Sequence, residues 1–349
     1  MIAKMDNRPA TAAATNSMGL DPVEQAPPVS VWQRLLSKQA FWVTIAVFLI
    51  PLAMTLVEPA FAAVFWKEGN IFNVTRNFAF IAIIALGQVA VMITGGIDLS
   101  VGSVLAVSGI VLGLVMSADY SFWLAALAAI MAGVACGAFN GYLISYLRLS
   151  PFVVTLGMLS IGRSLALAIS NNKFFYQFGH DQKLLIELGG GETLGVANPV
   201  IFLVILALLM AFVFRFTKWG RHLYAIGGNE QAARLTGVPV DRLKLEVYVL
   251  SGLMTAISAI LTVGWLGSVT NGIGLGYELR VIASTVIGGA NLMGGEGGAY
   301  AAFIGAALIE VIRNSLLLAG VDPYWQGTFV GLFIILAVLL ERLRGRRVN

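Results

Sequence analysis

Ten apolar stretches dominate the chain, and each is long enough, or nearly long enough, to cross a lipid bilayer as a helix. A spanning helix needs about 20 mostly apolar residues, because the hydrocarbon layer is ~30 Å thick. The predicted helices are Phe41–Val57, Phe78–Thr94, Gly102–Ser117, Phe122–Leu147, Phe152–Ile169, Pro199–Phe214, Val247–Leu266, Val281–Asn291, Ala299–Leu318 and Tyr324–Leu340. The eighth is too short to span alone, so we expect it to be re-entrant or broken by neighbouring glycines. A count of eight or nine spans also fits the pattern.

Composition supports a membrane protein. Of 349 residues, 58% are hydrophobic and only 11% are charged, whereas soluble domains carry about 25% charged residues. This balance excludes a soluble globule, a disordered chain and a fibrous protein. Because helices satisfy their own backbone hydrogen bonds in lipid, the predicted fold class is an all-α polytopic membrane protein of about ten helices, with a range of eight to ten.

The positions of the basic residues predict the orientation. Lys and Arg accumulate on the cytoplasmic side of membrane proteins. Basic residues are concentrated in the connection between the sixth and seventh helices and at the C-terminal end, namely Arg215, Lys218, Arg221, Arg234, Arg242, Lys244, Arg342, Arg344, Arg346 and Arg347. We therefore expect both termini to be cytoplasmic and the long connection Asn171–Asn198 to face the outside.

The domain organisation is simple. Residues 1–31 are polar and predict a disordered cytoplasmic tail, whereas residues 32–349 form the transmembrane domain with a cytoplasmic loop over 216–246. The single cysteine, Cys136, excludes an internal disulfide, and His180 and His222 are too far apart for a local metal motif. No phosphate-binding G-x-x-x-x-G-K-[ST] motif and no catalytic set occur, so we predict a non-enzyme without metal or cofactor, whose energy comes from a partner or an ion gradient.

Two glycine-rich segments interrupt the apolar pattern. Ile93–Ser103 reads ITGGIDLSVGS, and Val286–Gly298 reads VIGGANLMGGEGG. Asp98 and Asn291 each follow the first glycine of a pair by three residues, which suggests a duplicated unit. The first segment fits either a capped turn between two helices or a polar break beside a solute path, where irregular backbone is allowed if it lines a cavity.

Polar residues inside apolar helices are candidates for the solute path, because charges there are costly and usually face the bundle interior. Hydrogen bonding between helices is the alternative role for the uncharged ones. The candidates are Gln88, Asp98, Ser100, Asn140, Arg163, Asn291 and Asn314. Glu310 and Arg313 are spaced to neutralise each other on one helix face. Gly133, Gly137 and Gly141 recur every fourth residue, which predicts close helix packing.

The cytoplasmic loop carries an ordered pattern. Gly227-Gly228-Asn229 predicts a turn, Glu230–Leu235 predicts a short helix, and Gly237 and Pro239 end it. An ordinary positively charged connector is the alternative, but it would not need such an arrangement. We expect the segment to dock a soluble partner.

Five segments, in order, resemble the inner-membrane permease subunits of ABC sugar importers of the ribose, galactoside and xylose group. They are GGIDLSVGS (95–103), SPFVVTLGMLSIGRSLAL (150–167), GRHLYAIGGNEQAARLTGVPV (220–240), VIGGANLMGGEGG (286–298) and NSLLLAGVDPYWQG (314–327). The resemblance implies a bacterial inner-membrane location and a second permease copy or paralogue. It also implies a cytoplasmic ATPase that binds ATP and Mg, and a periplasmic sugar-binding protein that delivers the sugar. It assigns ATPase coupling to the 220–240 segment, with Gly227, Gly228, Asn229, Ala232, Ala233 and Gly237 as candidates.

Two further classes of function compete with an ABC permease. A proton- or sodium-coupled secondary transporter would use a buried carboxylate, for which Asp98 and Glu310 are the candidates. A membrane-embedded enzyme lacks a catalytic set. We interpret the clustered basic residues of the 216–246 loop and the C-terminal end as a signal of membrane orientation, and we expect no nucleic-acid partner. Ribose, xylose, galactose, arabinose, fructose, inositol and furanose forms all remain compatible with the spans.

Overall fold

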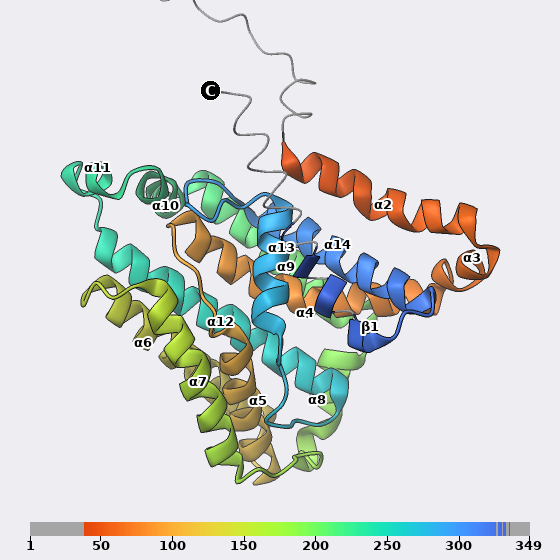
Figure 1. Ribbon diagram of the computed structural model, residues 1–349. Coiled ribbons are helices and arrows are strands. Elements are labelled where there is room, and N and C mark those ends of the chain that lie inside the picture. The colour runs from red at the N-terminus through yellow and green to blue at the C-terminus, as the bar shows by residue number, and fades with distance from the viewer. Residues whose placement is uncertain (1–37, 326, 330, 333–334, 336–349) are drawn as a thin grey trace, which may run out of the picture. The chain divides into compact units, whose positions relative to one another are not determined.

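The computed structural model describes residues 38–325, 327–329, 331–332 and 335, and these residues are almost entirely helical (Figure 1). The elements are α2 (Gln39–Val57), α3 (Pro59–Phe65), α4 (Glu68–Ile93), α5 (Val101–Ser117), α6 (Phe122–Ser145), α7 (Pro151–Ser170), η1 (Gly179–Asp181), α8 (Gln182–Gly190), β1 (Glu192–Thr193), β2 (Val196–Ala197), α9 (Asn198–Phe216), α10 (Lys218–Gly228), α11 (Glu230–Leu235), α12 (Val240–Leu266), α13 (Tyr277–Gly288), α14 (Ala299–Leu318) and η2 (Pro323–Trp325). The predicted tail over 1–31 and most of the predicted helix Tyr324–Leu340 lie outside the described residues.

The first nine predicted helices are all present in the described chain. The largest boundary differences are at α4 and α12, which begin ten and seven residues before the predicted starts at Phe78 and Val247. Both extensions carry charged and polar residues. A helix can continue from the hydrocarbon layer into water, so these residues belong to the helix although they lie outside its apolar stretch. Seven helices of the described residues are long and apolar enough to cross a membrane, and α5 is a shorter apolar helix.

Helices α4 and α12 form the core. In their most apolar windows 89% of α4 and 78% of α12 is buried inside the protein, against 11% for α2. The outer helices present leucine, isoleucine and phenylalanine side chains outward, including Phe48, Leu208 and Phe212. A lipid environment accommodates such a surface, because acyl chains are as apolar as these side chains.

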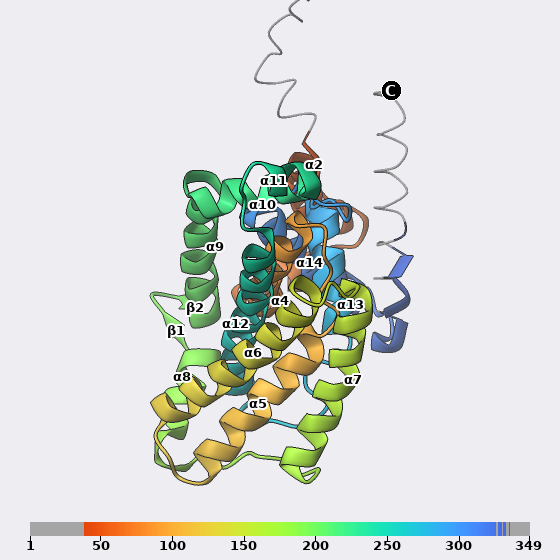
Figure 2. The ribbon, with the colours of Figure 1, turned by 90° about the vertical axis from the view of Figure 1, so that its left-hand side faces the viewer.

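The connections predicted on opposite sides of the membrane lie at opposite ends of the helices. Figure 2 shows α10 and α11 at one end and α8 toward the other. Helix α4 ends beside α10, whereas α12 reaches α8 at its far end, where Gly264 lies against Gly189. The predicted loop 216–246 and the predicted outer connection Asn171–Asn198 are therefore separated by the length of the spanning helices.

Glycines bring α6 and α12 into backbone contact, as the four-residue spacing predicts. A Cβ atom on Gly133 would lie 2.6 Å from the Gly252 carbonyl oxygen, and one on Gly137 would overlap the Tyr248 carbonyl oxygen. The α6–α12 interface is the most extensive helix pair of the described structure. The hydrophobic driving force between helices is weak in lipid, so the close van der Waals packing that these small residues allow holds α6 and α12 together.

We predict that Gly137→Ala lowers the thermal stability of the detergent-solubilised protein by about 1–3 kcal/mol, because the added methyl group overpacks this interface. Gly157→Ala in α7 is the matched control, since no atom lies within 4 Å of a Cβ there. The control should leave the melting temperature unchanged or raise it slightly through helix propensity. Equal melting temperatures for the two variants would contradict the close α6–α12 contact.

Candidate functional site

The segment between α4 and α5 is non-helical backbone inside the helix bundle. Helix α4 ends at Ile93, α5 begins at Val101, and Thr94–Ser100 joins them as an extended trace (Figure 1). We call this segment the first break. Its N-cap residue, Ser100, makes no side-chain bond to the α5 amides within the described structure, so a simple capped turn does not describe it.

The Asp98 side chain fixes the first break to the core. Its Oδ1 accepts hydrogen bonds from the Ser100 amide at 2.9 Å and the Ser100 hydroxyl at 2.6 Å. Its Oδ2 accepts one from the Ser251 hydroxyl at 2.8 Å. Ser251 lies eleven residues into α12, which places the contact about 16 Å along that helix. Measured from the predicted membrane entry at Val247, Ser251 lies about 6 Å into the span, so the break is held just over one turn inside the membrane-spanning region.

Gln88 and Asn140 complete the network around this carboxylate. The Asn140 amide donates to the Ser100 hydroxyl at 3.0 Å. The Gln88 amide, oriented to satisfy both partners, bonds the Asp98 backbone N–H and C=O at 3.2 Å each. The four predicted path residues in this network are all buried, and Asp98 is only 2% exposed. They are Gln88, Asp98, Ser100 and Asn140. Four of the seven candidates thus form one cluster that braces the break against α4, α6 and α12.

The other three predicted path residues lie elsewhere and bind within the chain. The Arg163 guanidinium donates to the carbonyl oxygens of Asn271 at 2.8 Å and Ile273 at 2.9 Å, which holds the segment before α13. Asn314 exchanges hydrogen bonds with Asn70 at 3.0 and 3.1 Å. Asn291 Oδ1 accepts from the Met293 amide at 2.8 Å and stabilises a turn. The structure does not bring these residues to the Asp98 cluster.

The second predicted break, around Asn291, shares its local geometry with the first. Asp98 and Asn291 each accept a hydrogen bond from the amide two residues later, which forms an Asx turn. The surroundings differ, because Asp98 is buried whereas Asn291 is half-buried. The similarity suggested by the sequence thus holds for the turn and not for its environment.

Helix α13 is a half-length helix, as predicted, and its start meets the start of α5. It has only 12 residues, and it is flanked by Gly274, Gly276 and Gly289, all with positive φ. A Cβ on Gly274 would lie 2.6 Å from the Gly102 carbonyl oxygen. Two helices that begin inside the bundle therefore face each other with their partially positive N-terminal ends.

A junction of glycines joins both breaks to the end of α10, and we call Gly95, Gly227, Gly294 and Gly295 the glycine junction. The Gly295 amide donates to the Ile93 carbonyl at 2.9 Å. A Cβ on Gly227 would overlap the Ile93 carbonyl oxygen and the Gly295 amide, and one on Gly294 would lie 3.0 Å from the Gly95 nitrogen. Only glycine permits this approach of three backbone segments.

The predicted coupling residues divide into exposed and buried groups. Gly228, Asn229, Ala232 and Gly237 are exposed, whereas Gly227 is held in the glycine junction and Ala233 is 4% exposed, inside the core. The predicted short helix Glu230–Leu235 is confirmed as α11, and Asn229 caps it by accepting from the Ala232 amide at 2.9 Å. Ala233 therefore anchors α11 and is not available for a partner.

Sequence reasoning missed Leu235, an apolar side chain of α11 that is 89% exposed. The signal was present, because Ala232 and Leu235 are three residues apart and share a helix face, while Ala233 faces inward. An apolar side chain left in water at a helix end is typical of a contact surface.

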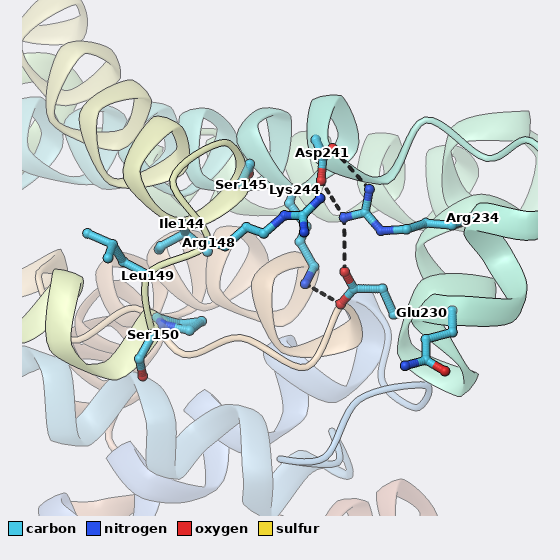
Figure 3. A pocket seen from close by; sticks show the side chains of 11 residues that line it. Ile144, Ser145, Arg148, Leu149, Ser150, Glu230, Arg234, Asp241 and Lys244 are labelled. Carbon is cyan, nitrogen blue, oxygen red and sulfur yellow. Dashed lines mark hydrogen bonds and ion pairs between the residues drawn. The ribbon is translucent and has the colours of Figure 1, made fainter.

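Ion pairs tie α11 to the start of α12 (Figure 3). Arg234 bonds Asp241 and, at 3.1 Å, Glu230, and Lys244 bonds Glu230 at 2.5 Å. Burial favours a higher pKa for Glu230, but the hydrogen bonds and charges of Lys244 and Arg234 outweigh it, so the pKa lies below the ordinary 4.5. These pairs therefore stabilise the segment above that pH, and the contribution is lost as the pH falls through the folded-state pKa.

We predict that Asp98→Ala destabilises the protein by about 3 kcal/mol, because buried donors lose their acceptor. Ser251→Ala removes one donor and leaves the carboxylate two others, so we expect a loss of about 1 kcal/mol. Thermal unfolding in one detergent measures both, with Ser268→Ala, a weakly bonded hydroxyl, as the control. Equal stability of Asp98→Ala and Ser268→Ala would contradict the bracing role of the carboxylate.

Comparison with known proteins identifies the family. Residues 70–338 match the family described as branched-chain amino acid transport system / permease component. The chain is 36% identical over 278 residues to the ribose import permease protein RbsC of Escherichia coli, covering 79% of this chain and 87% of that protein. It is 33% identical over 307 residues to the D-allose transport system permease protein AlsC of Escherichia coli, covering 87% and 93%.

A solved structure has the same fold. It is described as an inward-facing ABC transporter assigned to the metal-chelate type, with a TM-score of 0.51 and 15% identity, covering 87% of this chain and 98% of that one. At this identity the likeness concerns the fold alone. The matched range and the identities of the relatives establish that the chain belongs to this family of multi-pass ABC transporter permease components.

Proposed function

We propose that the chain is the permease subunit of an ABC importer for a monosaccharide or a related neutral polyol. The observation that carries the proposal is the family match combined with the names of the relatives, which import ribose, D-allose and, in Rhizobium meliloti, fructose. The bundle interior supports a neutral cargo. The two carboxylates Asp98 and Glu310 are hydrogen-bonded within the chain, as in the pair of Glu310 with Arg313, although one buried oxygen of Glu278 has no partner in the described structure.

The same geometry counts against the secondary transporter. Asp98 accepts three hydrogen bonds, and Glu310 accepts from the Arg313 Nε at 2.8 Å. A carboxylate that carries a proton across the membrane must exchange it with solvent, whereas these two are buried and hydrogen-bonded within the chain. The energy for transport then comes from ATP bound with Mg by a separate cytoplasmic ATPase.

We assign ATPase docking to the exposed face of α10 and α11. Leu235 offers an apolar anchor, surrounded by Gly228, Asn229, Ala232 and Gly237. The end of α10 continues into the glycine junction, so a movement of the docked segment would displace both breaks. The opposite end, which includes Asn171–Asn198, would receive solute from a periplasmic sugar-binding protein. A second permease copy or paralogue would complete the channel in the inner membrane.

We predict that Leu235→Glu reduces co-purification of the cognate ATPase about tenfold, because a charge replaces the apolar anchor at the centre of the contact. Leu194→Glu is the matched control, since Leu194 is 98% exposed in the β1–β2 turn at the other end of the molecule. Both variants should insert and melt like the parent protein. Full ATPase retention by Leu235→Glu would contradict this docking surface.

Uptake into membrane vesicles that contain the complete system tests the function itself. With ATP supplied, collapse of the proton and sodium gradients should leave uptake of the sugar unchanged, whereas removal of ATP should abolish it. The sugar for this test is the ligand that the partner binding protein retains on purification. Uptake that stops when the gradients collapse, with ATP preserved, would favour the secondary transporter.

A further inference from the structure

A cavity of about 650 Å³ lies between the α6–α7 connection and the α11–α12 segment. Figure 3 shows its lining, in which Arg148 extends from the connection toward the side chains of α11 and α12. The lining residues are Ile144, Ser145, Arg148, Leu149, Ser150, Pro151, Glu230, Gln231, Arg234, Asp241 and Lys244. None of the seven candidate path residues lies in it, whereas Glu230, Gln231 and Arg234 belong to the 220–240 segment predicted to dock a partner.

The charges of the cavity leave one cation available. Glu230 is bonded by Lys244 and Arg234, and Asp241 is bonded by Arg234, so both carboxylates are already neutralised. Arg148 makes no hydrogen bond or close ion pair with the part of the chain that the structure describes, and its charge acts on Asp241 only at longer range, where it helps to lower the pKa of that carboxyl. Three basic groups therefore surround two carboxylates, and the cavity carries a net positive charge.

Further hydrogen-bond donors in the lining lack partners. Ser145 is 3% exposed, and its hydroxyl has no partner in the described structure. Ser150 and Pro151 place the start of the 20-residue helix α7 at the cavity. The first amides of a helix have no intrahelical acceptor and favour a bound anion. The cavity thus combines a guanidinium, a buried hydroxyl and a helix N-terminus.

The surface beside the cavity is apolar. Tyr146, Leu147, Leu149, Phe152 and Val153 adjoin it in sequence, and each is between 47% and 63% exposed. A free phosphate ion would use only the polar groups, whereas a phospholipid would also cover this apolar surface. Tyrosine near such a boundary is typical of the membrane–water interface.

We propose that this cavity binds the headgroup phosphate of an anionic phospholipid, with the acyl chains on the exposed apolar residues of α6 and α7. The phosphate contacts Arg148, the Ser145 hydroxyl and the start of α7, opposite the ion pairs of α11 and α12. A lipid bound there joins the membrane surface to the segment assigned to ATPase docking. It gives the protein a preference for anionic lipids that is separate from the solute it transports.

Native mass spectrometry of the full-length detergent-solubilised protein tests this proposal with phosphatidylglycerol and phosphatidylcholine as probes. We expect preferential retention of phosphatidylglycerol. Arg148→Asn, which suits the positive φ of 55° at this residue, should reduce retention about fivefold, as expected for one basic residue at an anionic surface. Arg148→Lys should restore most of it, and Ser145→Ala should reduce it without lowering the melting temperature.

Arg221→Asn is the control, because it removes an exposed cation of α10 outside the cavity. Retention unchanged by Arg221→Asn but lost in Arg148→Asn supports a specific site. Equal losses in the two variants would overturn the proposal, as would equal retention of the two lipids. Displacement of phosphatidylglycerol by millimolar inorganic phosphate would also overturn it, because the phosphate ion would then suffice as ligand.

Discussion

The hydrogen bonds to the Asp98 carboxylate hold together the part of the structure that a lipid environment would otherwise not allow. Non-helical backbone at membrane depth is tolerated only where protein or a water-filled cavity covers it. The first break meets this condition because Ser100 and Ser251 satisfy the carboxylate, while Gln88 satisfies its backbone. Three hydrogen bonds offset part of the desolvation cost that this buried carboxylate would carry without partners. The starting point of α5 depends on this arrangement.

The glycine junction extends this constraint to the end of the bundle that carries α10 and α11. Gly227 at the end of α10 touches the Ile93 carbonyl, where α4 gives way to the first break, and Gly295 in the second break. Tyr224 adds a hydrogen bond to the Gly297 carbonyl at 2.9 Å. Backbone contacts of this kind leave little room for relative sliding. We infer that the docking face and the two breaks move as one unit.

Much of the fold could be predicted because lipid makes the local pattern decisive. A spanning helix must be apolar along its length, so helix α14 has the predicted bounds Ala299–Leu318, and α11 follows directly from its cap and glycine signals. The Gly133 and Gly137 spacing predicted helix contact for the same local reason. The early start of α4 escaped prediction, because polar residues that leave the bilayer carry no hydropathy signal, whereas the polar segment Asp241–Leu245 was expected to begin the helix that became α12.

The candidate site was only partly predictable, since it depends on which distant segments meet. Sequence position could not tell that Asp98 and Asn140 share Ser100 while Arg163 binds the segment before α13. It could not separate buried Ala233 from exposed Ala232 either, as this depends on how α11 packs on the core. The sequence predicted Gly227 only as a turn residue. Its contacts with both breaks became visible only in the three-dimensional structure.

The most direct measurement of this account is the ratio of sugar uptake to ATP hydrolysis in proteoliposomes that contain the complete transporter. Gly227→Ala adds a methyl group inside the glycine junction, whereas Gly228→Ala adds one where no atom lies within 4 Å. We expect Gly227→Ala to retain the ATPase and its hydrolysis but to lower the ratio about tenfold, and Gly228→Ala to keep the parent ratio. The same ratio in both variants would show that the junction does not transmit movement to the breaks.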